Sequence, residues 1–327
     1  MTTSDAPATR PLNAELLLTD PAAGPLLALS PHLDDVIFSA CAPVLARPLE
    51  VWTVFAGEPT IPVTTAWDDS CGFRDSADAL ATRRGEDRAA FAGSQATVRH
   101  LAYLDGPYTD PARRTADLVG LRTELGRWLD EHPGGTVLAP ACAGVQVRPA
   151  VWDRFRRHHE APADSSRPTQ EGANPQPGSA STEPASPVSR TLAAAKDVLR
   201  GCLHRDYQRR RAAAQRKGLA VNNDHVAVRD AVLEVAGSRP GVGVVLYEDL
   251  PYLWAQPADS EVARLTRMGL TPVEFFLPVD VAEKFRLIQA YASQVQVMDP
   301  QQHRLSRPGF LPERERYWQL ANRRSAA

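Results

Sequence analysis

The sequence predicts an α/β fold built around a mainly parallel sheet. Short apolar runs of strand length alternate with longer segments whose apolar residues recur at helical spacing, which is the pattern of βαβ units. The chain has 327 residues and a hydrophobic content of 43%, enough for one large α/β domain or two smaller ones. Acidic and histidine side chains follow the first apolar run, where open α/β sheets place their sites.

The first half of the chain contains four predicted strands. They are expected at residues 26–29, 49–55, 98–104 and 136–139. The helices between them are expected at residues 35–46, 76–91 and 115–129. Ser76 is the expected cap of the second helix, because its hydroxyl can accept from the first helical N–H groups. Residues 58–72 are expected to form a loop.

The pattern resumes after residue 218. Helices are expected at residues 225–235, 261–268 and 281–295, and Asp280 is the expected cap of the last one. Strands are expected at residues 242–246 and 273–277. We expect the tail, residues 307–327, to pack through its apolar side chains Phe310, Leu311, Tyr317 and Trp318.

The composition predicts a single domain, residues 21–327, that is interrupted by one insertion and preceded by a flexible arm, residues 1–20. The insertion covers about 148–217 and is basic and proline-rich. We expect disorder at 161–190, which has six prolines and no aromatic residue, because it cannot bury enough apolar surface to offset its ordering entropy. The run Arg209–Arg211 is interpreted as a solvated helix face.

Charge and cysteine content exclude several classes of protein. The net charge of −2 gives no reason to expect nucleic acid or an anionic membrane as partner. The four cysteines lie far apart without a CxxC spacing, which argues against a thiolate zinc cluster or a disulfide framework. Apolar runs are too short for a signal peptide or a membrane span. We therefore expect a soluble cytoplasmic protein.

The strongest chemical signal is the segment LLALSPHLDDVIFSA, residues 26–40. It places His32, Asp34 and Asp35 where a buried strand ends and a helix begins. Nitrogen and oxygen donors of this kind are ligands of catalytic zinc sites, which use about three protein ligands and leave a position open for water. His32 and Asp35 are the expected ligands from this segment. Among the eight histidines, His225 is the best candidate for a third, because it also opens a helix after a polar loop.

Asp34 then has a possible role as the base that takes a proton from an attacking water. The alternative for Asp34 and Asp35 is a purely structural one, an N-cap followed by a favourable charge in the first helical turn. The presence of His32 upstream and of Asp224 with His225 downstream favours the catalytic interpretation.

These residues carry a family resemblance. SPHLDDVIFSA resembles the SPHPDD or AHPDD signature of the LmbE/PIG-L-like zinc deacetylases, the N-acetylglucosaminyl deacetylase superfamily, and NNDHVAVRDA resembles that family's HPDH or NxDH element. ATRRGEDRAA, YLDGPY, LYEDLPY and KFRLIQAYASQ resemble further elements of it. The resemblance covers roughly 25–145 and 218–300. Either signature alone is a weak signal, and both in this order are specific.

The resemblance implies a Rossmann-like, LmbE-like sheet and one bound Zn²⁺. It also implies an enzyme that removes an N-acyl group, typically acetyl, from an amino sugar or glycoconjugate by hydrolysis. It implies His32, Asp35 and His225 as metal ligands and Asp34 as general base. Asp224 would orient or tune a catalytic group. The residues implied for holding sugar hydroxyls are Arg83, in an R-x-x-E pattern with Glu86, and Asp105; their structural alternatives are a helix-face ion pair and a turn residue.

The chain departs from the family pattern at Leu33, often proline in the family, and at Asn222, where many members have histidine. Asn222 can donate a hydrogen bond to an oxyanion, but it cannot supply a proton. Asp34 would then act first as base and later as acid. The alternative is that the enzyme is slow or that its leaving group differs. A non-catalytic or weakly active binding protein on the same fold is the alternative. A nucleotide-binding Rossmann protein would need a glycine-rich first turn, which SPHLDD lacks. The acyl acceptor and the oligomeric state cannot be inferred from the sequence.

Overall fold

A computed structural model describes residues 14–145, 209, 220–237, 239–299 and 302–321. All the elements below belong to one compact unit, formed by residues 1–145 and 218–327. The predicted insertion at 148–217, its disordered part at 161–190 and residues 1–13 of the predicted arm lie outside the described residues, apart from Arg209.

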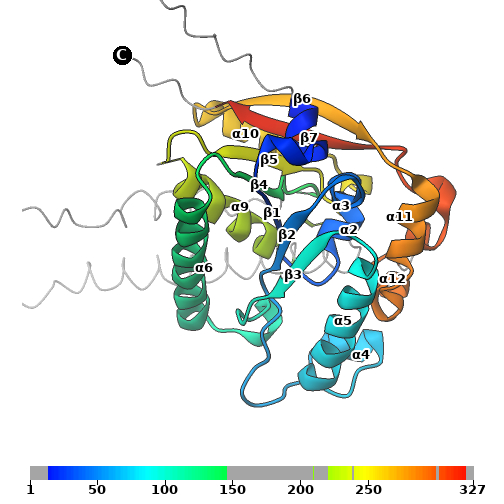
Figure 1. The fold of residues 1–327 in the computed structure, drawn as a ribbon. Helices are drawn as coiled ribbons and strands as arrows, with labels where there is room; N and C mark the ends of the chain where they lie inside the picture. Colours follow the sequence, from blue (N-terminus) through cyan, green and yellow to red (C-terminus); the bar gives the residue numbers. More distant parts are fainter. Residues whose placement is uncertain (1–13, 146–208, 210–219, 238, 300–301, 322–327) are drawn as a thin grey trace, which may run out of the picture. The chain divides into compact units, whose positions relative to one another are not determined.

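A seven-stranded sheet with the order β3-β2-β1-β4-β5-β7-β6 forms the centre of this unit (Figure 1). Five strands run parallel, and β6 and β7 pair antiparallel at one end. The strands are β1 (Leu26–Ser30), β2 (Leu49–Thr53), β3 (Ala96–His100), β4 (Thr136–Pro140), β5 (Gly243–Tyr247), β6 (Thr271–Pro278) and β7 (Arg314–Ala321). The predicted α/β class with a mainly parallel sheet is confirmed.

The order of the strands reverses between β1 and β4. From β1 the chain builds outward through β2 to β3, and it then returns to place β4 and β5 on the other side of β1. In doubly wound sheets the crevice at the carboxyl ends of the strands beside such a reversal is the usual ligand site. The fold therefore brings the segment that follows β1 into this crevice.

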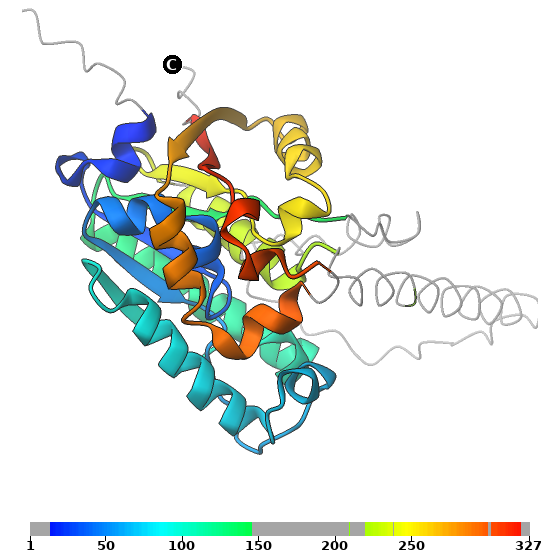
Figure 2. The ribbon, with the colours of Figure 1, turned by 90° about the vertical axis from the view of Figure 1, so that its right-hand side faces the viewer.

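Helices cover both faces of the sheet (Figure 2). They are α1 (Ala14–Thr19), α2 (Asp35–Ser39), α3 (Cys41–Ala46), α4 (Ala66–Cys71), α5 (Ser76–Phe91), α6 (Pro111–Glu131), α9 (Asn223–Ala236), α10 (Asp259–Arg267), α11 (Val281–Ile288) and α12 (Ala292–Met298). One core cluster lies under α2, α3, α5 and α11, and a second lies under α6, α9 and α10.

The alternation of side chains along β1 fills both clusters. Leu26 and Ala28 belong to the first cluster and Leu27 and Leu29 to the second. All four are at most 2% exposed. Burying one leucine side chain stabilises the fold by about 1.5–3 kcal/mol. The strand that carries the candidate site at its end is thus fixed from both sides.

Several boundaries differ from the predicted ones. Residues 14–19 of the predicted flexible arm form α1, because Leu17 and Leu18 are buried in the fold. The predicted helix at 35–46 is broken at Ala40, whose ψ of 44° is not helical. The cap of α5 is Asp75, whose side chain accepts from Asp78 N, and not Ser76. The expected cap of α11, Asp280, is confirmed.

The C-terminal part differs more. The predicted helix at 281–295 is two helices, α11 and α12. The tail contains β7, which inserts between β5 and β6, so that Tyr317 and Trp318 are buried as predicted while Phe310 is 49% exposed. The loop predicted at 58–72 contains α4, which Thr65 and Asp68 cap reciprocally. Among the described helices, none combines the length and apolar content that a membrane span needs.

Candidate metal centre and active site

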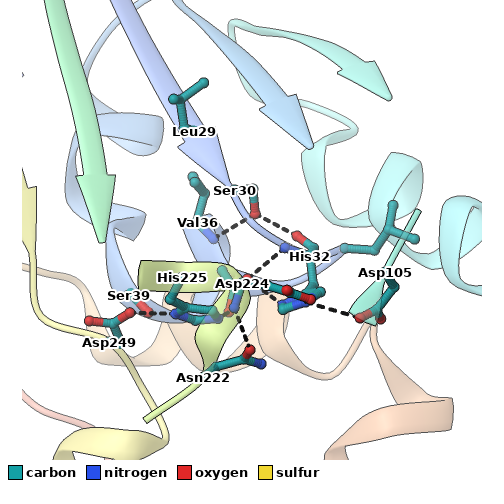
Figure 3. Close-up of polar contacts among 12 residues, drawn as sticks. Leu29, Ser30, His32, Val36, Ser39, Asp105, Asn222, Asp224, His225 and Asp249 are labelled. Atoms are coloured by element: carbon teal, nitrogen blue, oxygen red, sulfur yellow. Dashed lines mark hydrogen bonds and ion pairs between the residues drawn. The ribbon is translucent and has the colours of Figure 1, made fainter. Parts of the chain in front are cut away.

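The turn after β1 is held by its own polar groups (Figure 3). Ser30 Oγ donates to the carbonyl of His32 (2.6 Å) and accepts from the N–H of Val36 (3.1 Å). The N–H of His32 donates to Asp35 Oδ2 (2.7 Å). The segment therefore turns sharply from strand into α2 and directs the side chains of His32 and Asp35 to the same side.

The three residues that the sequence predicts as metal ligands, His32, Asp35 and His225, meet at one point. One donor atom from each lies within 4.8 Å of the others. His32 Nδ1 is 3.2 Å from Asp35 Oδ2, and His225 Nε2 is 3.2 Å from Asp35 Oδ1. All three residues are buried, although His225 comes from the first turn of α9, about 190 residues further along the chain.

These residues fit a metal ion. His225 Nε2 is a buried ring nitrogen without a hydrogen-bond partner among the described residues, and it faces the other two donors. Two imidazoles and one carboxylate are a donor set that suits Zn²⁺. Burying a polar atom unpaired costs free energy, and a cation shared by the three donors removes that cost.

Asp34 lies beside the three donors in an unusual environment. It is 1% exposed, and neither carboxylate oxygen has a hydrogen-bond partner among the described residues. Burial, followed by the charge of Asp35, raises the pKa of Asp34 to about 7. Asp34 occupies the N-cap position of α2, yet its side chain makes no capping hydrogen bond. The alternative that the Asp34 side chain caps α2 is therefore not supported by the structure.

Two further carboxylates face the other nitrogen of His32. Nε2 lies 3.3 Å from Asp224 Oδ2 and 3.5 Å from Asp105 Oδ1. Burial alone lowers the pKa of His32, but Asp105, Asp224 and Asp35 outweigh burial and raise it well above its usual value. Asp224 also accepts from the N–H of Gly106 (3.0 Å) and pairs with Arg114 (2.9 Å). Asp224 therefore contacts a predicted ligand directly.

Arg83 is buried and lies near Asp105, with 3.9 Å between Nη1 and Oδ2. Burial works against the charge of Asp105, but His32 and Arg83 hold its pKa well below the usual range. Glu86 faces elsewhere and accepts from the N–H (2.7 Å) and hydroxyl (2.6 Å) of Ser293. Arg83 and Asp105 thus lie together at the site, whereas Glu86 secures the start of α12.

Asn222 is the N-cap of α9. Its Oδ1 accepts from the N–H of Asp224 (2.9 Å), and its Nδ2 donates to the hydroxyl of Tyr252 (3.3 Å). The cap fixes the first helical turn, from which both Asp224 and His225 reach the site. Tyr252 in turn packs its ring edge-on against His225, with 5.2 Å between the ring centroids.

No family model matches the sequence, and no curated protein matches it either. The A40926 pseudoaglycone deacetylase is similar in structure, with a TM-score of 0.55 and 22% identity over 93% of this chain and 99% of that one. A zinc-inhibited form of the teicoplanin deacetylase has a TM-score of 0.55 and 20% identity over 92% and 99%. A deacetylase–teicoplanin complex has a TM-score of 0.53 and 21% identity over 90% and 97%. The chain has the fold of these deacetylases.

Two further residues at this site were not predicted from the sequence. Asp249 follows β5 and contacts His225 Nδ1 at 2.5 Å. The sequence contained a signal for Asp249, because this acidic residue follows a predicted buried strand just as His32 does. Arg114 lies in α6, with its guanidinium 4.1 Å from the ring centre of Phe55. Nothing in the surrounding sequence distinguishes Arg114 from the other arginines of that helix.

Proposed function

We propose that this protein is a metal-dependent deacylase that removes an N-acyl group, acetyl being the first choice, from an amino sugar in a small molecule or glycoconjugate. The observation that carries the proposal is the convergence of His32, Asp35 and His225 beside the unpartnered carboxylate of Asp34. The fold shared with deacetylases supports an amide as the bond that is cut.

A Zn²⁺ ion held by His32, Asp35 and His225 supplies Lewis acidity, which polarises an amide carbonyl and makes a water more acidic. Asp34 takes the proton of the attacking water while the water oxygen bonds to the carbonyl carbon. The carbon–nitrogen bond then breaks, the nitrogen receives a proton, and an amine and a carboxylate leave. Burial raises the pKa of the Asp34 carboxyl above its usual value in the metal-free chain, which makes this carboxylate a better proton acceptor.

Asn222 has no acidic proton, so Asp34 is the group that returns the proton to the leaving nitrogen. The amide Nδ2 of Asn222 donates one hydrogen to the Tyr252 hydroxyl, and its second hydrogen can stabilise negative charge on the carbonyl oxygen. Arg83 and Asp105 lie on the other side of His32 and suit hydroxyl groups of a sugar, since they offer a donor and an acceptor together.

Zinc analysis combined with a deacetylation assay tests the proposal. We expect about one Zn²⁺ per full-length chain and release of free amine from a panel of N-acetylglucosaminyl conjugates and teicoplanin-like glycopeptides. The panel includes the latter because one structural neighbour binds teicoplanin. Less than about 0.2 Zn²⁺ per chain after zinc-supplemented expression would contradict the metal site. Full zinc occupancy with no amine release across the panel would favour the non-catalytic binding protein.

A further inference from the structure

We infer that Asp249 is a positioning residue that fixes the tautomer of His225 and so makes this side chain a metal ligand. The inference rests on the proposed metal site. Asp249 is fully buried and lies just after β5, on a different strand connection from the other site residues. Its Oδ1 is 2.5 Å from His225 Nδ1 (Figure 3). Nε2 of the same ring is 3.2 Å from Asp35 Oδ1.

The second oxygen of Asp249 is held by the backbone after β4. Oδ2 accepts from the N–H of Cys142 (2.7 Å) and from the N–H of Ala143 (3.0 Å). Cys142 has a φ of +70°, a left-handed conformation that costs a non-glycine residue about 1 kcal/mol or more. Successive N–H groups beside a left-handed residue form a small anion-binding concavity. The strained turn therefore presents two donors to one carboxylate oxygen.

In the neutral form of the His225 ring, which is the form that binds a metal, these contacts leave only one arrangement of protons. Oδ2 is occupied by two backbone donors, so Oδ1 is the oxygen that meets His225. A carboxylate oxygen accepts and cannot donate, so it requires the proton of His225 to lie on Nδ1. The lone pair then lies on Nε2, which is the nitrogen that faces the predicted ligand Asp35.

Asparagine in place of Asp249 has nearly the same shape but cannot satisfy both neighbours. If its NH₂ group faces Cys142 and Ala143, donors oppose donors in a buried site. If the NH₂ group faces His225 instead, it favours a lone pair on Nδ1 and a proton on Nε2, which blocks metal binding. Alanine produces neither conflict, because it leaves the ring free to take either tautomer.

The test compares zinc affinity of full-length Asp249→Asn and Asp249→Ala, measured by competition with a chromophoric chelator. We expect Asp249→Asn to weaken Zn²⁺ binding by about 100-fold and Asp249→Ala by only about 10-fold. If Asp249 acted only by packing, Asp249→Ala would weaken Zn²⁺ binding more than Asp249→Asn, because alanine leaves the larger cavity. Equal affinities, or weaker binding by Asp249→Ala, would overturn the inference.

Asp87→Asn is the matched control. Asp87 is equally buried and accepts from a histidine, His100 Nε2 (2.7 Å), and from the Tyr291 hydroxyl (2.7 Å). It lies among α5, β2 and β3 and touches none of the proposed ligands. We expect Asp87→Asn to lower the melting temperature of the metal-free protein while leaving zinc affinity within about two-fold of wild type. A comparable loss of affinity in this control would overturn the inference.

A second measurement needs no variant. In the zinc-loaded wild type with ¹⁵N-labelled histidine, we expect the proton of His225 on Nδ1 and none on Nε2. A proton on Nε2 in a protein that binds zinc would overturn the inference and leave the proposed metal site standing. A wild type that binds no zinc would instead overturn the proposed function, and the inference with it.

Discussion

At the scale of single residues, Asp34 and Asp35 show how one step along the chain separates two roles. Asp35 accepts from its own turn and faces both histidines, and His225 and His32 overcome burial to hold its pKa well below the usual range. Asp34 has no such partners, and burial raises its pKa. The same residue type therefore has a lowered pKa at the position proposed as a metal ligand and a raised pKa at the position proposed as general base.

Asp34→Asn tests this difference. We expect deacylation to fall by about 10²–10⁴-fold, because a general base contributes about that much, while zinc occupancy stays near one. The metal-free variant should be at least as stable as wild type in urea unfolding, because the substitution removes an unpartnered buried charge. Turnover close to that of wild type would contradict the assignment of Asp34 as base.

Asn222→Ser separates two roles of Asn222, the N-cap of α9 and the proposed hydrogen-bond donor to the carbonyl oxygen. Serine is also a good N-cap, so we expect the free energy of unfolding to change by less than about 0.5 kcal/mol. The amide donor is lost, and we expect kcat to fall roughly 10²-fold if that amide stabilises the carbonyl oxygen. Asn222→Ala is the companion variant and should cost about 1 kcal/mol of stability in addition. An unchanged kcat in both variants would reduce Asn222 to a helix cap.

The residues predicted from the sequence are those whose signals are local. His32, Asp34 and Asp35 lie within four positions, and His225 follows a similar polar loop. Asp249 and Arg114 gain their roles only from contacts with residues more than 20 positions away, His225 and Asp224 respectively. The partner atoms of such residues are set by the packing of β5 and α6, which a single sequence does not specify.

At the scale of elements, the strands and helices of the parallel half could be predicted because their apolar runs are separated by clear polar breaks. The short helices α1 and α4 were not predicted, and neither was β7 in the antiparallel part of the sheet. The β7 sequence RERYWQLA has charged residues in its first three positions and was predicted as part of a C-terminal tail rather than as a strand. In the structure it pairs with both β5 and β6. One reason is Glu315, whose oxygens accept from the N–H groups of Cys41 and Ala42 at the start of α3 (2.9 Å each).

Glu315 also pairs with Lys284 of α11 at 2.6 Å, and both side chains are almost fully buried. We expect Lys284→Met to destabilise the protein by about 3–5 kcal/mol in urea unfolding, because it leaves an uncompensated buried carboxylate. Arg286→Met is the matched control on the same helix, since Arg286 pairs with Glu283 at the surface. That control should change stability by less than about 1 kcal/mol. Similar losses in the two variants would contradict this role for the buried pair.

At the scale of the whole molecule, the proposed site brings together residues from three separate segments of the chain. His32 and Asp35 follow β1, Asp249 follows β5, and His225 opens α9. The strand reversal at β1 and β4 brings these ends together. The sequence predicted a site at the carboxyl end of the first strand from the polar break there, but it did not predict the strand order. A metal ion bound by His32, Asp35 and His225 would link the turn after β1 directly to the start of α9, and His225 in turn contacts Asp249 after β5.

Zinc should therefore raise the melting temperature of the full-length, metal-free protein. At a free concentration of 100 times Kd, binding to the folded state alone adds about 2.7 kcal/mol. For a chain of 327 residues that corresponds to a rise of about 4 °C, because the entropy of unfolding grows with chain length. His225→Ala should abolish the rise, because it removes the ligand that links α9 to the turn after β1. His303→Asn, a change at an exposed histidine remote in sequence from the predicted ligands, should retain it. A zinc-dependent rise that persists in His225→Ala would place the bound metal elsewhere on the molecule.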